Sequence, residues 1–328
     1  MNYKPPYSLT DSIIFLVEQI GEALDRASMQ GKQELRLRRV NRIRTIHGSV
    51  AIEGNTLSEK QITAILEGKR VVAPPREVLE VRNALAAYSQ LSNWVPENEA
   101  HLLKAHALLM AGLLDGVGRY RSQNAGVMGP AGVIHVAPPA ERVSCLMKQL
   151  LGWLESAKQH PLVAAAVFHY EFEFIHPFAD GNGRTGRLWQ TLILSRWNPL
   201  FADLPVESIV HLHQQEYYAA INRSSAGNDC APFIEFILKM ILETLDTDQV
   251  SDQVSDQVGR LLAVMQEGST AALELMKKLA LLHRPTFRKN YLQPALFAGL
   301  IEMTRPDAPR AKNQKYRLTA KGRSKLRG

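Results

Sequence analysis

The twelve residues 176–187, HPFADGNGRTGR, constrain the fold of this chain more than any other part of its sequence. Three glycines and an asparagine lie here, directly before and within the start of a helical pattern that runs through residues 184–197. Glycines at the start of a helix leave backbone N–H groups accessible to a ligand, and the positive end of the helix dipole favours an anion there. The sequence therefore predicts an anion-binding loop that ends one helix and begins the next.

Phosphate is the anion that best fits this loop. Gly181, Asn182 and Gly183 would form a cradle for it, because a glycine-rich backbone can approach phosphate oxygens closely. Arg184 and Arg187 lie three residues apart on one face of the helix, where both guanidinium groups can bind further phosphate oxygens. Two arginines beside one cradle indicate a di- or triphosphate ligand rather than a single anion.

Two other side chains of the loop suggest chemistry on that ligand. Asp180 supplies a hard carboxylate oxygen next to the phosphates, the kind of ligand that Mg²⁺ prefers. An imidazole can accept a proton near neutral pH, so His176 is the candidate general base for an attacking hydroxyl. Phe178, between them, is expected to anchor the loop in the core.

The glycines also permit a second interpretation. Gly181, Gly183 and Gly186 fit GxGxxG, the pattern of dinucleotide-binding loops, and Asp203 lies twenty residues beyond Gly183. In that pattern the glycines follow a buried β-strand, whereas residues 161–174 have the apolar spacing of a helix. An NAD-type oxidoreductase is therefore the weakest of the functions considered.

The chain before residue 246 is expected to be mainly α-helical. Helical spacing of apolar residues is found in the stretches 9–27, 35–53, 77–94, 97–114, 141–156 and 161–174. Residues 125–128 and 133–136 differ, because they are short extended pieces on either side of the turn sequence Gly-Pro-Ala-Gly. They predict a β-hairpin, which is either a structural projection or a place where another chain adds a strand.

The sequence DQVSDQVSDQVG, residues 248–259, indicates a boundary between domains. It has low complexity, and its valines recur every four residues, as in a short helical linker. Beyond it, three helical stretches and two strands around a basic loop predict a winged helix. Residues 284–328 hold twelve Lys or Arg against two acidic residues, a balance of +10 that exceeds the net charge of +7 of the whole chain. Such a cluster suits DNA or an acidic protein, or is a solvated face.

Composition excludes several classes of protein. With 45% hydrophobic and 22% charged residues, the chain is of the globular kind, neither disordered nor fibrous. The longest apolar run, residues 162–168, is too short to span a membrane, and residues 1–10 lack the pattern of a secretion signal. Cys145 and Cys230 are too few for a disulfide framework or a thiolate metal site. We therefore expect a cytoplasmic protein without a membrane partner.

The loop as a whole resembles the signature of the Fic family, HPFx(D/E)GNGRxxR, which residues 176–187 match without departure. The resemblance covers residues 75–245 and includes the hairpin. It implies a helical core with a hairpin flap, and transfer of AMP from Mg-ATP to a Ser, Thr or Tyr hydroxyl of a protein. The roles that it implies are general base for His176, Mg²⁺ ligand for Asp180, phosphate cradle for Gly181, Asn182 and Gly183, phosphate clamps for Arg184 and Arg187, and target-docking flap for Val133, Ile134, His135 and Val136.

Residues 49–54, SVAIEG, resemble the inhibitory motif (S/T)xxxE(G/N) of regulated Fic proteins. The resemblance implies that Ser49, Glu53 and Gly54 belong to an inhibitory helix, and that Glu53 pairs with Arg187 and prevents productive seating of the γ-phosphate. A carboxylate in the last turn of a helix faces the negative end of the dipole, which favours a cationic partner. The alternative is a solvated glutamate before a glycine that ends the helix.

Together these features predict a mainly α-helical protein with four segments. They are an N-terminal helical region with the inhibitory helix (1–95), a Fic core with a hairpin flap (96–245), the DQV linker (246–259) and a winged-helix domain (260–328). The expected function is that of an autoinhibited protein adenylyltransferase that uses ATP and Mg²⁺ and modifies itself. Removal of AMP, with Glu53 positioning a water, stays open, as do the target protein and homo-oligomer formation. The alternative is a winged-helix DNA-binding regulator whose upstream domain senses nucleotide, which would not need His176 as a base.

Overall fold

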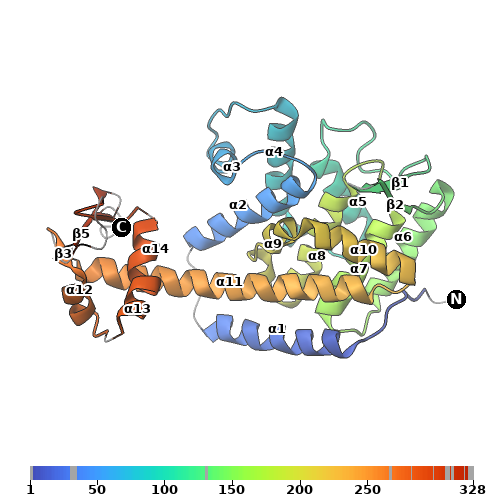
Figure 1. Ribbon diagram of the computed structural model, residues 1–328. Helices are drawn as coiled ribbons and strands as arrows, with labels where there is room; N and C mark the ends of the chain where they lie inside the picture. Colours follow the sequence, from blue (N-terminus) through green and yellow to red (C-terminus); the bar gives the residue numbers. More distant parts are fainter. Residues whose placement is uncertain are drawn as a thin grey trace. The chain divides into compact units, whose positions relative to one another are not determined.

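The computed structural model describes residues 3–29, 35–129, 132–265, 268–281, 283–297, 299–306, 311, 314–320 and 322–323. The chain divides into two compact units, Met1–Leu245 and Asp246–Gly328. Helices predominate, and the strands of the described residues form one hairpin in the first unit and one small sheet in the second (Figure 1). The prediction of a mainly α-helical fold is confirmed.

The first unit is built from helices of seven to nineteen residues and the beginning of a longer one. In chain order they are α1 (Asp11–Met29), α2 (Leu35–Ile52), α3 (Glu59–Leu66), α4 (Pro75–Ser89), the 3₁₀ turn η1 (Leu91–Asn93), α5 (Glu99–Leu109), α6 (Ala140–Glu155), α7 (Pro161–Ile175), α8 (Asn182–Trp197), the 3₁₀ turn η2 (Pro199–Ala202), α9 (Val206–Leu212), α10 (Gln214–Gly227) and α11 (Ala231–Val264). The helix expected over residues 97–114 is shorter than predicted. It ends at Leu109 because Gly112, Gly116 and Gly118, which follow, all have φ near +70°, outside the helical region.

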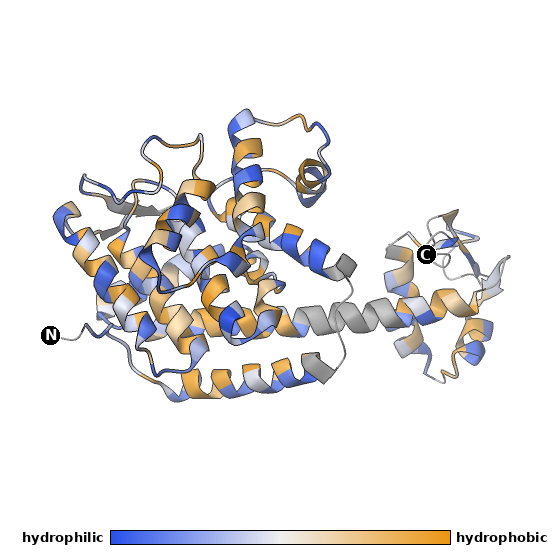
Figure 2. Cartoon of the chain, turned by 180° about the vertical axis from the view of Figure 1, so that it is seen from behind, coloured by the Kyte–Doolittle hydropathy of each residue, from blue (hydrophilic) through white to orange (hydrophobic). Residues whose placement is uncertain are grey.

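Helix α7 forms the centre of the first unit. All of its residues except Pro161 and Phe174 are buried, as in a helix that others cover on every side. It packs against α6 and α8, and its C-terminal end leads directly into the predicted anion-binding loop. The outer helices are instead striped with polar and apolar residues (Figure 2). Although α7 is apolar, no helix among the described residues is both long and apolar enough to cross a membrane.

Helix α2, which carries the predicted inhibitory motif, lies close against α9. A side chain at Gly48 would be 2.5 Å from backbone atoms of Glu207 and Ser208, so only glycine permits this approach. Ser208 Oγ also donates a hydrogen bond to the carbonyl oxygen of Arg44 (2.8 Å). The packing therefore fixes α2, and with it Ser49 and Glu53, relative to the rest of the unit.

The predicted hairpin is present. Strands β1 (Gly126–Gly129) and β2 (Gly132–Val136) pair antiparallel, with a bulge where the register shifts between Val127 and Met128. The backbone of the flap residues belongs to β2, but the side chains of Val133, Ile134, His135 and Val136 lie outside the described part of the structure.

The DQV segment is not a separate element. It belongs to α11, one continuous helix of 34 residues that begins in the first unit and ends in the second. The second unit continues with β3 (Thr270–Ala271), α12 (Ala272–Lys278), α13 (Arg284–Phe287), the π turn η3 (Arg288–Leu292), α14 (Gln293–Phe297), β4 (Ile301–Met303) and β5 (Lys315–Leu318). Its strands form an antiparallel sheet in the order β3-β5-β4, which is consistent with the predicted winged helix and adds one strand, β3, to the two expected.

Candidate active site

His176 lies at the C-terminal end of α7. Its backbone has φ 49° and ψ 62°, in the left-handed region, which costs about 1–2 kcal/mol for a residue with a Cβ atom. Arg121 holds the chain there, because its Nε donates to the carbonyl oxygen of His176 (2.7 Å) and its Nη2 to that of Ile175 (3.3 Å). Arg121 thus fixes the point at which the chain leaves α7, and so it helps to position the side chain of His176.

Asn182 closes the loop that follows. Its side-chain oxygen accepts a hydrogen bond from the backbone N–H of Phe178 (2.8 Å), and its Nδ2 donates to the carbonyl oxygen of Phe178 (2.9 Å). Gly181 has φ 82°, and a side chain there would lie 2.5 Å from Sδ of Met110. Since both polar atoms of the Asn182 side chain are used within the loop, we expect Asn182 to shape the cradle rather than to bind phosphate through its amide.

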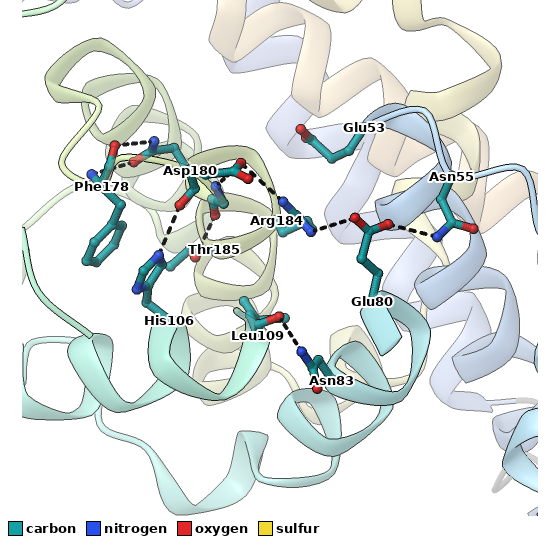
Figure 3. Close-up of polar contacts among 12 residues, drawn as sticks. Glu53, Asn55, Glu80, Asn83, His106, Leu109, Phe178, Asp180, Arg184 and Thr185 are labelled. Carbon is teal, nitrogen blue, oxygen red and sulfur yellow. Dashed lines mark hydrogen bonds and ion pairs between the residues drawn. The ribbon is translucent and has the colours of Figure 1, made fainter. Parts of the chain in front are cut away.

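His106 supports the loop from below, in α5 (Figure 3). Its Nδ1 accepts a hydrogen bond from the backbone N–H of Gly118 (3.0 Å), so Nε2 carries the proton and donates to the carbonyl oxygen of Asp180 (3.0 Å). Its ring stacks on Phe178, with 3.7 Å between the ring centroids. Burial lowers the pKa of His106, which favours the neutral form that these two hydrogen bonds require. Phe178 is fully buried, as predicted for the anchor of the loop.

Asp180 and Arg184 face each other across the first turn of α8 (Figure 3). Oδ1 of Asp180 accepts a hydrogen bond from the backbone N–H of Gly181 (2.6 Å) and lies 3.2 Å from Nη2 of Arg184. The Asp180 side chain is 42% exposed, so a metal ion can reach it from solvent. Among the described residues no group of three or more His, Cys, Asp or Glu could hold a metal ion, so a metal at Asp180 would need phosphate or water oxygens as its other ligands.

Arg187, on the next turn of α8, is held by the predicted inhibitory motif. Its Nη2 donates to Oε1 of Glu53 (2.6 Å) and to the carbonyl oxygen of Ser49 (2.9 Å), and its Nε to the Ser49 hydroxyl (3.4 Å). Burial, the largest single cause, acts to lower the pKa of Arg187, but Glu53, Tyr217 and Glu173 together outweigh it and the pKa is raised. Gly54 follows α2 with φ 91°, as a glycine that ends a helix does. The motif residues are therefore brought together with Arg187 across 134 positions of sequence.

The carboxylate of Glu53 lies over Gly183, at the start of α8. A side chain at Gly183 would collide with Oε1 of Glu53 and lie 2.9 Å from Nη1 of Arg187. A carboxylate oxygen thus lies between the N-terminus of a helix and an arginine, a setting that favours an anion.

A cluster of buried polar side chains lies behind His176 and Arg187. Oε2 of Glu173 is 4.0 Å from Nδ1 of His176, and its Oε1 is 3.9 Å from Nε2 of His169. Burial raises the pKa of Glu173 to about 8; Arg187 acts to lower it and Glu53 to raise it. Burial also lowers the pKa of His169 to about 3. The cluster therefore holds a protonated acid and a neutral imidazole near pH 7.

Replacing Glu173 with Gln should change how stability depends on pH. Between pH 4.5, the ordinary pKa, and about 8, the native carboxyl is protonated while the unfolded one is ionised. Unfolding then releases a proton, so native stability falls as pH rises, by at most about 1.4 kcal/mol per pH unit. Gln cannot ionise. The melting temperature of Glu173→Gln minus that of the parent should therefore increase from pH 5 to pH 8. Above pH 8 this difference should stay constant. A difference that is constant across this range would contradict the buried, protonated acid.

One cavity of about 180 Å³ adjoins these groups. Its polar side is formed by the anion-binding loop together with Glu53, His176 and Arg187. The cavity is also lined by residues of α7 and α10, namely Tyr170, Phe174, Tyr217, Tyr218, Ile221 and Ser225. A pocket lined by a glycine-rich loop, an arginine and aromatic rings suits a nucleotide, since a base can stack on a ring while its phosphates bind the loop.

The comparisons with known proteins agree with this geometry. Residues 96–194 match the Fic/DOC family, and residues 256–319 match the Fic-like C-terminal domain. The crystal structure of a Fic family protein from Desulfovibrio desulfuricans is 51% identical in sequence; it aligns over 98% of this chain and 99% of its own, with a TM-score of 0.74. The chain belongs to the Fic family. Fic-1 from C. elegans is also similar, at 26% identity over 74% of this chain and 74% of its own, with a TM-score of 0.60.

Curated Fic relatives match part of the chain. A protein adenylyltransferase Fic from Culex quinquefasciatus is 35% identical over 62% of this chain, and one from Aedes aegypti is 32% identical over 70%. The matches cover 41% and 46% of those two proteins, so this chain corresponds to less than half of their length.

Proposed function

We propose that this Fic protein is a protein adenylyltransferase, which transfers AMP from ATP to a hydroxyl group of a protein. The observation that carries the proposal is the anion site, in which Glu53 lies on Gly183 and Arg187 within the same cavity as His176. The names of the curated relatives support it, since both are called protein adenylyltransferases. A nucleotide-sensing regulator would need the cradle but not a general base beside it.

The side chains of the loop take distinct parts in the proposed reaction. His176 accepts the proton of the attacking hydroxyl, whose oxygen bonds to the α-phosphorus as the bond to pyrophosphate breaks. The backbone of Gly181 and Gly183, with Arg184 and Arg187, holds the phosphates and stabilises the negative charge that develops on the leaving pyrophosphate. Asp180 would hold Mg²⁺, which, when bound with ATP, neutralises phosphate charge.

The proposal includes autoinhibition of the enzyme by Glu53. Its carboxylate holds Arg187 by a 2.6 Å ion pair, so the guanidinium cannot bind a phosphate oxygen until Glu53 leaves. The Glu53 side chain is 30% exposed, and Glu53 follows the last residue of α2, so the side chain can rotate away from Arg187 while α2 stays packed. We propose no fixed direction for the enzyme, because a glutamate at this place could also position a water for removal of AMP.

The hairpin β1–β2 is the proposed docking site for the target. Each of its two strands has one edge without a strand partner among the described residues, so an extended segment can pair with it. The proposal extends to segments of the protein itself, which would account for self-modification.

Labelled ATP tests the proposed function directly. The purified protein, with Mg²⁺ and a cell lysate, is incubated with ATP labelled either on the α- or on the γ-phosphate. Adenylyl transfer puts label on protein from the α-position alone, because pyrophosphate carries the γ-label away. Label from the γ-position would show phosphorylation instead. No protein label from either ATP, even with Glu53 removed, would contradict the proposal.

A further inference from the structure

Glu80 of α4 connects the segment after the inhibitory motif to the first arginine of the loop (Figure 3). Its Oε2 accepts a hydrogen bond from Nδ2 of Asn55 (2.9 Å), the residue that follows Gly54. Its Oε1 lies 3.7 Å from Nη1 of Arg184. The Glu80 side chain is only 13% exposed, so this ion pair is better shielded from water than one on the surface.

Arg184 needs this partner because it is buried. The residue is 5% exposed, and removing a guanidinium from water is costly unless carboxylates balance its charge. Two carboxylates lie near it: Asp180, 3.2 Å from Nη2, and Glu80, 3.7 Å from Nη1. Its Nε and Nη1 are buried and have no hydrogen-bond partner within the described part of the chain, so Glu80 acts on this guanidinium through its charge rather than through a hydrogen bond.

The two carboxylates differ in what they can do when nucleotide binds. Asp180 is the more exposed of the two and is the proposed Mg²⁺ ligand, so its charge would then be shared with a metal. Glu80 is held from the other side by Asn55, away from the cavity lining. Arg76, 64% exposed, lies 3.6 Å from Glu80 and 3.7 Å from Asp180 on the solvent side of both. We therefore expect Glu80 to remain the charge partner of Arg184 when the nucleotide and Mg²⁺ bind.

We propose that Glu80 is a positioning residue for Arg184. This inference rests on the proposed function: the charge of Glu80 holds the guanidinium in place while Arg184 binds the phosphates of ATP. Glu80 does not itself touch the nucleotide.

The test compares two glutamates of α4 in a protein that already lacks the inhibitory carboxylate. In a Glu53→Gly parent, Glu80→Gln removes the charge beside Arg184. Glu77→Gln is the matched control, because Glu77 binds the same segment, at the backbone N–H (2.6 Å) and hydroxyl (2.8 Å) of Thr56, and has no contact with Arg184 in the described structure. Calorimetry then measures Kd for Mg-ATP and for adenosine, and labelling measures KM and kcat.

Glu80→Gln should weaken Mg-ATP binding about tenfold, or about 1.4 kcal/mol, because Arg184 loses the carboxylate that positions it. Adenosine, which has no phosphates, should bind as to the parent, and KM should change more than kcat. Glu77→Gln should match the parent in every measurement. Unchanged or tighter binding of Mg-ATP by Glu80→Gln overturns the inference, as does equal weakening of ATP and adenosine by both variants, which indicates a structural role. A parent that binds no ATP overturns the proposed function and this inference with it.

Discussion

Replacing His176 with alanine is expected to abolish transfer of AMP and to leave nucleotide binding intact. A general base typically contributes about 10²–10⁴-fold to a rate, so the loss should be at least a hundredfold. Binding should persist because the anion site consists of backbone N–H groups and arginines, not of the imidazole. The rate of protein labelling from α-labelled ATP and the Kd of Mg-ATP are the two measurements.

Alanine at this position carries a risk of its own, because the backbone of His176 has φ 49°. Alanine adopts this left-handed region poorly, whereas asparagine adopts it readily. His176→Asn is therefore the control that removes the base and keeps a residue suited to the turn. Both variants should lose transfer. If His176→Asn turns over normally, His176 is not the base, and if only the alanine variant fails, the loss comes from the backbone.

The candidate site could be predicted from the sequence where its residues are contiguous. Residues 176–187 place a histidine, an aspartate, a glycine-rich turn and two arginines within twelve positions of the sequence. Their proximity therefore follows from sequence spacing alone. The pairing of Glu53 with Arg187 joins distant elements, and only the resemblance to a known motif indicated it. Nothing in the spacing of either segment says that α2 meets α8; that contact depends on the packing of α2 on α9, which Gly48 permits.

The residues that support the loop could not be predicted. His106 and Arg121 each make hydrogen bonds that hold the loop or the end of α7, yet both lie more than fifty residues before the loop in the sequence. Glu80 and Glu173 are charged residues within helical patterns, where exposure to solvent is the usual outcome. Their burial depends on which neighbouring helix covers them, and this tertiary information is absent from local periodicity.

The fold shows the same division between local and tertiary information. The helical core and the hairpin follow from apolar spacing and turn residues, and both were predicted. The DQV repeat indicated a boundary, and the compact units divide at Leu245, next to it, yet the helix continues through the repeat. A period of four is compatible with a helix, so the sequence favoured helix there, but the length of α11 depends on the residues on either side of the repeat.

Replacing Glu53 with glycine is expected to raise self-labelling about tenfold or more. The carboxylate holds Arg187 through a 2.6 Å ion pair in a setting where the arginine is 3% exposed. A hydrogen bond to a charged group contributes about 1.5–3 kcal/mol, and each 1.4 kcal/mol is a factor of ten in the population of the competent state. The initial rate of label transfer from α-labelled ATP measures the effect.

Removing the Glu53 carboxylate should also change the stability of the protein. This change distinguishes an inhibitory glutamate from one that has no effect on the enzyme. Without nucleotide, the variant should melt at a lower temperature than the parent, because a buried guanidinium has lost its closest carboxylate. Glu173 limits this loss: with Glu53 gone, one of the causes that raise its pKa disappears, and its ionised form can balance the charge of Arg187. With Mg-ATP, phosphate oxygens replace the carboxylate, so the melting temperature should rise more in the variant than in the parent. Glu53→Gln, which keeps the size of the side chain but not its charge, should fall between the two. If the variant neither labels faster nor gains more stability from Mg-ATP, Glu53 is a solvated helix-end residue whose contact with Arg187 does not restrain the enzyme.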